Sequence, residues 1–76
     1  MSALITREQP MSDELYRAVV KTEAANFHVY ANDCGEAGLN VCGTKRDQLV
    51  LMNLPELDAL IEVLREMRNA MKGVPA

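Results

Sequence analysis

QLVLMNLPELDALIEVLREMRNAMKGVP, residues 48–75, is the stretch that decides the fold of this chain. Asn53 can accept a backbone hydrogen bond as the N-cap of a helix, and Glu56, three residues later, can complete a capping box. Pro55 lies in the first turn, where a helix does not need the N–H that proline lacks. Together these residues predict that a helix begins at Leu54.

The same stretch predicts where the helix ends and which side of it is buried. Gly73 can adopt the left-handed conformation that follows many helices, and Pro75 prevents continuation, so we expect a helix over Leu54–Lys72. At about 100° per residue its apolar side chains fall on one stripe, which makes the helix amphipathic. The stripe consists of Leu54, Leu57, Leu60, Ile61, Leu64, Met67 and Met71, flanked by Ala59, Val63 and Ala70.

This apolar stripe is wider than the arc of a little over 100° that usually suffices against one sheet face. Residues 48–52 are predicted to form a strand with apolar side chains on both faces, so one face needs a partner beyond a single helix. We therefore predict a homodimer, and the alternative is that the N-terminal arm covers the surplus. The predicted dimer contacts are Val50, Met52, Val63, Met67, Ala70 and Met71.

Further strands are predicted upstream of the helix. Residues 27–32 alternate apolar and polar side chains, and residues 39–43 resume the alternation after a glycine-rich turn. Residues 15–23 fit either a strand or a helix, and the pair Val19 and Val20 favours the strand. The predicted fold class is α+β, with a small antiparallel β-meander of three to four strands packed by one C-terminal amphipathic helix.

Two regions of different character follow from this pattern. Residues 1–14 show no periodicity and include Gln9, Pro10 and Ser12, so we expect a flexible N-terminal arm. Residues 15–76 form a single α+β domain in this interpretation. No internal repeat or interdomain linker is visible.

The composition indicates a small globular protein. The 76 residues include 49% hydrophobic and 25% charged residues and carry a net charge of −3. Eleven acidic residues outnumber eight basic ones, which argues against strong nonspecific binding to nucleic-acid phosphates. The sequence shows no signal peptide and no apolar stretch of about 20 residues, and two cysteines are too few for a disulfide framework. We expect a soluble cytoplasmic protein that does not contact membranes.

The candidate metal ligands are His28, Asp33, Cys34 and Cys42, which lie on or beside the predicted hairpin. Because the spacing Cys-x-x-Cys is missing and free cysteines are commonly buried as small apolar side chains, we predict no metal site and no cofactor. The hairpin would place Cys42 roughly opposite Tyr30 and diagonal to His28. A Cys–His nucleophile also needs a group that orients the imidazole, and none is evident, so we predict that the protein is not an enzyme.

The sheet face opposite the helix is the candidate binding surface. In the strand interpretation it is mixed and mildly basic, although a solvated polar face is the ordinary alternative for an antiparallel sheet. Gly35 and Gly38 spell Gly-x-x-Gly in the hairpin, where we expect both to adopt positive φ in a turn. The predicted partner-binding residues are Arg17, Lys21, His28, Tyr30, Asn40, Lys45 and Arg46.

The order of strands, polar turn, capped helix start and amphipathic helix resembles a known family. Over Tyr16–Lys72, with LMNLPE at residues 51–56 as the nearest local similarity, it resembles the single-strand DNA-binding domain of the positive-cofactor-four transcriptional coactivators. The resemblance implies nucleic-acid binding through the sheet. The chain departs from those basic, aromatic-rich proteins because it is acidic, with one Phe, two Tyr and no Trp, so few side chains can stack on bases.

Two functions of different classes follow from these observations. The preferred hypothesis is a non-enzymatic interaction or regulatory protein that binds a host protein, similar to the small acidic inhibitors that phages encode. It rests on the lack of a catalytic set and on surplus apolar surface in which methionines can repack at a contact. The alternative is a single-strand nucleic-acid-binding module that uses Arg17, Lys21, His28, Tyr30, Lys45 and Arg46.

Overall fold

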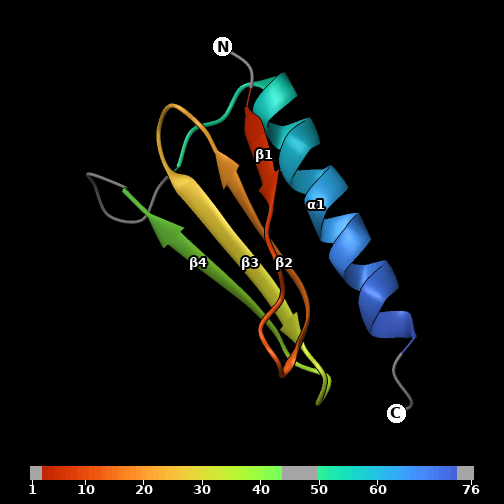
Figure 1. Cartoon of the computed structure of the whole chain (residues 1–76). Coiled ribbons are helices and arrows are strands. Elements are labelled where there is room, and N and C mark those ends of the chain that lie inside the picture. Colours follow the sequence, from red (N-terminus) through yellow and green to blue (C-terminus); the bar gives the residue numbers. More distant parts are fainter. Residues whose placement is uncertain (1–2, 44–49, 74–76) are drawn as a thin grey trace.

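The computed structural model describes residues 3–43 and 50–73. Four antiparallel strands form one sheet in the order β1-β2-β3-β4, and a single helix packs on one face of it (Figure 1). This arrangement confirms the predicted α+β fold class. The elements are β1 (Leu4–Arg7), β2 (Glu14–Lys21), β3 (Asn26–Asn32), β4 (Ala37–Cys42) and α1 (Leu54–Lys72).

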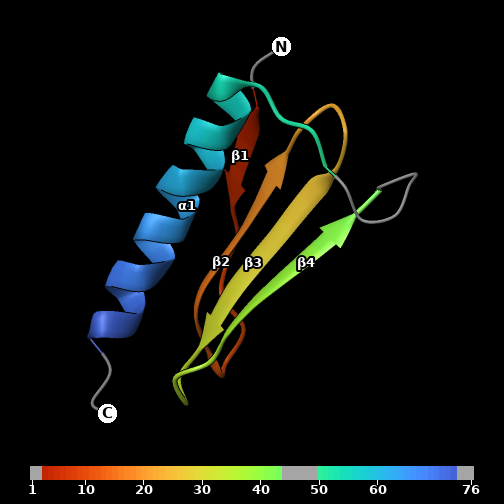
Figure 2. The same ribbon diagram turned by 180° about the vertical axis from the view of Figure 1, so that it is seen from behind.

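The helix is too narrow to cover the whole sheet. It packs against β1, β2 and β3, and within residues 3–43 and 50–73 no contact joins it to β4. Figures 1 and 2, which view the molecule from opposite sides, show α1 running beside β1 with β4 at the far side of the sheet. A helix about 10 Å across spans only two to three strands that lie about 4.8 Å apart. The sheet surface over β4 is therefore left uncovered by the helix.

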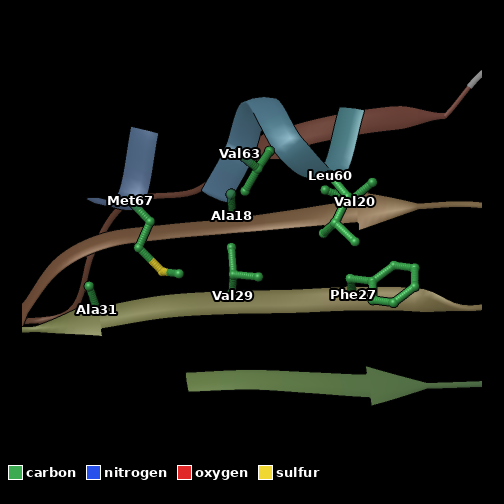
Figure 3. Close-up of a cluster of buried hydrophobic side chains, with 8 residues drawn as sticks. All are labelled: Ala18, Val20, Phe27, Val29, Ala31, Leu60, Val63 and Met67. Atoms are coloured by element: carbon green, nitrogen blue, oxygen red, sulfur yellow. The ribbon is translucent and has the colours of Figure 1, made fainter. Parts of the chain in front are cut away.

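The hydrophobic core lies between α1 and the two central strands (Figure 3). Val63 of the helix is 0% exposed and Met67 is 8% exposed, so both side chains are buried within a single copy. The prediction that these two residues contact a second subunit is therefore wrong, because the chain's own sheet fills that side of the helix. The buried cluster consists of Ala18, Val20, Phe27, Val29, Ala31, Leu60, Val63 and Met67.

The remaining predicted dimer contacts also lie near this core. Val50, Met52 and Met71 are partly buried and pack against the cluster, and Ala70 is partly buried on the helix. The protein does expose apolar surface, as the sequence indicates, but this surface lies on other residues of α1 and on β4.

The helix has the predicted bounds, Leu54–Lys72, and the predicted capping box. The Asn53 side chain accepts a hydrogen bond from the N–H of Glu56 at 3.0 Å, and the Glu56 carboxylate accepts one from the N–H of Asn53 at 2.9 Å. Glu56 is buried, and its second oxygen is satisfied by a hydrogen bond from the N–H of Glu23 at 3.1 Å. One carboxylate therefore caps the helix and ties it to the turn between β2 and β3.

Two glycine predictions are wrong. Gly73 ends the helix with a right-handed φ of −79°, and its N–H donates to the carbonyl of Ala70. Gly35 has the expected positive φ of 93°, but Gly38 lies within β4, where a Cβ would overlap the ring of Tyr30. Gly38 thus provides room for an aromatic ring on the neighbouring strand.

The structure differs from the prediction in the first and the last strand of the sheet. Leu4–Arg7, predicted to belong to a flexible arm, forms β1 and pairs with β2, with Ile5 opposite Val20. Residues 50–52, predicted to end a strand, are not in the sheet, and residues 48–49 lie outside the described residues. The fourth strand therefore comes from the N-terminus. The predicted strands over residues 15–23, 27–32 and 39–43 are confirmed as β2, β3 and β4.

Val63→Ala tests whether this position belongs to the core of one copy. We expect a loss of about 2 kcal/mol in the free energy of unfolding, because the substitution leaves a cavity at a fully buried site. Urea denaturation at two protein concentrations measures it, and the loss should be equal at both. Leu51→Ala, at an exposed position, is the control and should change stability by less than about 0.5 kcal/mol. A loss that depends on concentration would show instead that Val63 lies in an interface.

Glu56→Ala tests the link between the helix start and the β2–β3 turn. The substitution leaves the N–H groups of Asn53 and Glu23 without this acceptor, so we expect a loss of about 1–3 kcal/mol in the free energy of unfolding. Glu56→Gln keeps one acceptor oxygen and should lose less. Equal losses in the two variants would contradict the proposed role of the hydrogen bonds.

Candidate interaction surfaces

The open face of the sheet, opposite α1, carries the predicted partner-binding residues that the structure describes. The strand register aligns Arg17, Tyr30 and Gly38 in one row and Val19, His28 and Asn40 in the next. Lys21 begins a third row, with Asn26 and Cys42. The structure therefore brings Arg17, Lys21, His28, Tyr30 and Asn40 onto one face, as predicted. Lys45 and Arg46 lie outside the described residues.

Arg17, the guanidinium group on this face, is already paired with a carboxylate. The guanidinium group of Arg17 donates from Nε to Glu14 Oε1 at 2.8 Å and from Nη2 to Glu14 Oε2 at 2.9 Å. This contact lowers the pKa of Glu14, with a further contribution from the N–H of Met11. The guanidinium carbon also lies 6.0 Å from the centre of the Tyr30 ring, at the outer limit of a cation–π contact. Arg17 thus offers little free positive charge.

Tyr30 is held close to the sheet. Its ring occupies the space that a side chain at Gly38 would take, directly across the β3–β4 ladder. An aromatic ring beside a cross-strand glycine is a common stabilising pair in antiparallel sheets. The arrangement therefore explains Tyr30 through packing within the sheet.

The candidate metal ligands do not form a site. Among residues 3–43 and 50–73, no three His, Cys, Asp or Glu side chains lie close enough to share a metal ion. Cys42 lies opposite Asn26, not opposite Tyr30, although it is diagonal to His28 as predicted. The Cys34 thiol is exposed in the β3–β4 turn, where Asn32 Oδ1 accepts a hydrogen bond from its Sγ at 3.1 Å.

An ion-pair cluster holds the helix to the sheet on the β1 side, and we call it the Arg7 cluster (Arg7, Tyr16, Glu62 and Glu66). Arg7 donates to both oxygens of Glu66, at 2.8 and 2.6 Å, and to Glu62 at 2.9 Å. The Tyr16 hydroxyl donates to Glu66 at 2.7 Å. This cluster was not predicted from the sequence, because Arg7 and Glu66 are 59 residues apart and no local pattern connects them.

The Arg7 cluster shifts two titrations. The hydrogen bonds from Arg7 and then Tyr16 lower the pKa of Glu66 from 4.5 to about 2. Burial, followed by the hydrogen bond to Glu66, raises the pKa of Tyr16 to about 12. Both shifts favour the hydrogen-bonded forms, an ionised Glu66 and a neutral Tyr16, so the cluster is stable around neutral pH.

A row of apolar side chains on α1 remains exposed. Leu54 is 68% exposed, Leu57 is 42% exposed and Ile61 is 40% exposed. We call these three residues the α1 flank. Their spacing of three and four residues places them on one side of the first two turns. The preceding residue Leu51 is exposed as well.

A second exposed apolar pair lies on β4. Leu39 is opposite Val29 and Val41 is opposite Phe27, so both belong to the sheet face that α1 covers elsewhere. Because α1 does not reach β4, Leu39 remains 55% exposed and Val41 remains 38% exposed. These residues were predicted to lie in a strand but were not predicted as contacts.

The outer surface of α1 has a shallow depression of about 520 Å³. Two of its carboxylates, Glu62 and Glu66, already bind Arg7. Its walls come from a single helix, so it does not enclose a substrate in the way that catalytic pockets do. The lining residues are Asp58, Ile61, Glu62, Arg65, Glu66 and Asn69.

Comparison of the chain with models of protein families, with curated proteins and with solved structures finds no match. Within the described part of the chain, no helix has both the length and the apolar character required to span a bilayer.

The pH dependence of stability tests the Arg7 cluster. Because the folded state lowers the pKa of Glu66 to about 2, the stability from this carboxylate is full above about pH 5 and is lost as the pH falls toward 2. Glu66→Gln should lower the free energy of unfolding at pH 7 by about 1 kcal/mol, since the group is partly exposed. The variant should also lose less stability between pH 5 and pH 2 than the unsubstituted protein.

Urea denaturation across this pH range measures the effect. Asp58→Asn, which removes an exposed carboxylate from the same helix, is the matched control and should retain the original acid dependence. Identical acid dependence in Glu66→Gln and the unsubstituted protein would show that the cluster does not contribute to stability.

Proposed function

We propose that this chain is a small non-enzymatic interaction protein that binds a host protein through the α1 flank. The proposal includes a regulatory role of the kind played by small acidic inhibitors. It also includes a cytoplasmic location, which suits two free cysteines, one of them exposed.

The observation that carries this proposal is the exposure of the α1 flank on a helix whose core side is complete. The sheet already buries Leu60, Val63 and Met67, so the core does not need Leu54, Leu57 and Ile61. Apolar residues at this spacing are typical of a helix that docks into a partner's groove. Each such side chain contributes up to about 2 kcal/mol when an interface buries it fully.

The single-strand nucleic-acid alternative has less support. Arg17 is neutralised by Glu14, and the Tyr30 ring is packed beside Gly38. Among the described candidates, Lys21 remains as an exposed cation on the open face. Binding of single strands needs several cations and stacking rings along one groove. The alternative would be restored by oligonucleotide binding at low salt that is lost in Tyr30→Ala.

A comparison of two triple variants tests the proposed function. The tagged protein should retain a stoichiometric partner from a lysate of its host, and Leu54→Gln/Leu57→Gln/Ile61→Gln should lose it. Glutamine favours helices and the three positions are exposed, so the variant should keep its fold and its circular dichroism spectrum. Affinity for the captured partner, measured by calorimetry, should fall at least about a hundredfold, or roughly 2.7 kcal/mol.

The matched control is Met11→Gln/Leu39→Gln/Val41→Gln, which changes three exposed apolar residues that lie outside α1. It should retain the partner. Failure of the unsubstituted protein to retain any stoichiometric partner, or equal retention by the α1 flank variant, would refute the proposal.

A further inference from the structure

Among residues 3–43 and 50–73, strand β4 forms an edge of the sheet and has no described strand on its outer side. In the strand order β1-β2-β3-β4, β3 is the strand that pairs with β4 among the described residues. The N–H of Asn32 donates to the carbonyl of Glu36 at 2.9 Å, immediately before β4 begins. Because the direction of these groups alternates along an antiparallel ladder, the N–H and C=O groups of Leu39 and Val41 point outward from the sheet.

Strand β4 carries no charged side chain. Its sequence is AGLNVC, and like the interior strand β3 it contains no Asp, Glu, Lys, Arg or Pro. Edge strands are normally protected from pairing by charges, prolines, bulges or a covering helix. Strand β4 has none of these devices within the described residues, and its apolar residues Leu39 and Val41 are exposed.

The opposite edge of the sheet is protected. Strand β1 has four residues, carries Arg7 and lies against α1, to which the Arg7 cluster ties it. The two edges of one sheet therefore differ in the features that prevent strand pairing. This contrast makes β4 the edge at which another strand would add.

We propose that the occupant of the β4 edge is β4 of a second copy, paired antiparallel about a two-fold axis perpendicular to the sheet. Charge favours this occupant, because two chains that each carry a net charge of −3 repel except where their surfaces are neutral, as β4 is. A two-fold axis also brings the same uncharged strand, with the same outward N–H and C=O groups, to both sides of the contact.

The two exposed apolar residues select the register. Pairing Leu39 of one copy with Val41 of the other, and the reverse, places both apolar pairs on the sheet face that carries α1, over the strands that the helices do not reach. The two outward-pointing residues then form hydrogen-bonded pairs, and Asn40 lies opposite its own counterpart in a non-hydrogen-bonded pair. The sheet becomes an eight-stranded one with both helices on the same face. An interface of one strand pair is small, so we expect a dissociation constant of about 10–100 μM.

Sedimentation equilibrium of the purified full-length chain tests this proposal. The unsubstituted protein should show a concentration-dependent dimer. Leu39→Lys should weaken it at least about tenfold, because it places an ammonium group against the partner's apolar side chain. Leu39 is 55% exposed, so the variant should keep its circular dichroism spectrum. Leu54→Lys adds the same charge on the α1 flank and should leave the dimer unchanged.

A cross-link tests the register. In a Cys34→Ser/Cys42→Ser background, Asn40→Cys should form a disulfide-linked dimer under mild oxidation. Residues in a non-hydrogen-bonded antiparallel pair have Cα atoms about 4.5 Å apart, which is within the range for a disulfide of about 4.4–6.8 Å. Asn69→Cys in the same background, on the exposed side of α1, is the control and should not cross-link faster than free thiols in solution.

The proposal is overturned if the protein is monomeric at all concentrations, if Leu39→Lys dimerises as well as the unsubstituted chain, or if Asn40→Cys fails to cross-link. These outcomes are separate from those of the host-partner experiment. Leu39→Lys should still capture the host protein, and the α1 flank variant should still dimerise. Loss of one property without the other therefore identifies which of the two proposals fails.

Discussion

The structure depends on one geometric constraint, which is that a single helix must cover a sheet of four strands. A helix about 10 Å wide is matched to two or three strands at their usual spacing. Placing Val63 and Met67 over the central strands completes a small core, and β4 remains outside it. The exposed Leu39 and Val41 are a direct consequence of this mismatch in width.

The Arg7 cluster joins the helix to the side of the sheet that lies away from β4. Arg7 and Tyr16 both bind Glu66, and these contacts draw the helix toward the N-terminal side of the sheet. Glu56 adds a second tie at the turn between β2 and β3. The polar contacts therefore add modest stability on the side of the helix that faces β1 and the β2–β3 turn.

The chain has two exposed apolar surfaces on different elements, the α1 flank and the β4 edge. The first presents side chains in helical spacing, and the second presents outward backbone groups together with Leu39 and Val41. The α1 flank suits a partner protein, and the β4 edge suits pairing with another strand. Two of the six predicted dimer contacts, Val63 and Met67, are buried against the chain's own sheet.

The sequence by itself determined the helix Leu54–Lys72, its capping box, the strands β2, β3 and β4, and the shared face of Arg17, Tyr30 and Asn40, because these depend on interactions between residues close in the chain or on simple alternation. Only the tertiary structure decided the pairing of Leu4–Arg7 with β2, the Arg7 cluster, and which apolar residues stay exposed. An apolar stripe shows that a helix side is buried, but not which element buries it. That choice depends on contacts between residues far apart in the chain, for which a local sequence pattern carries no signal.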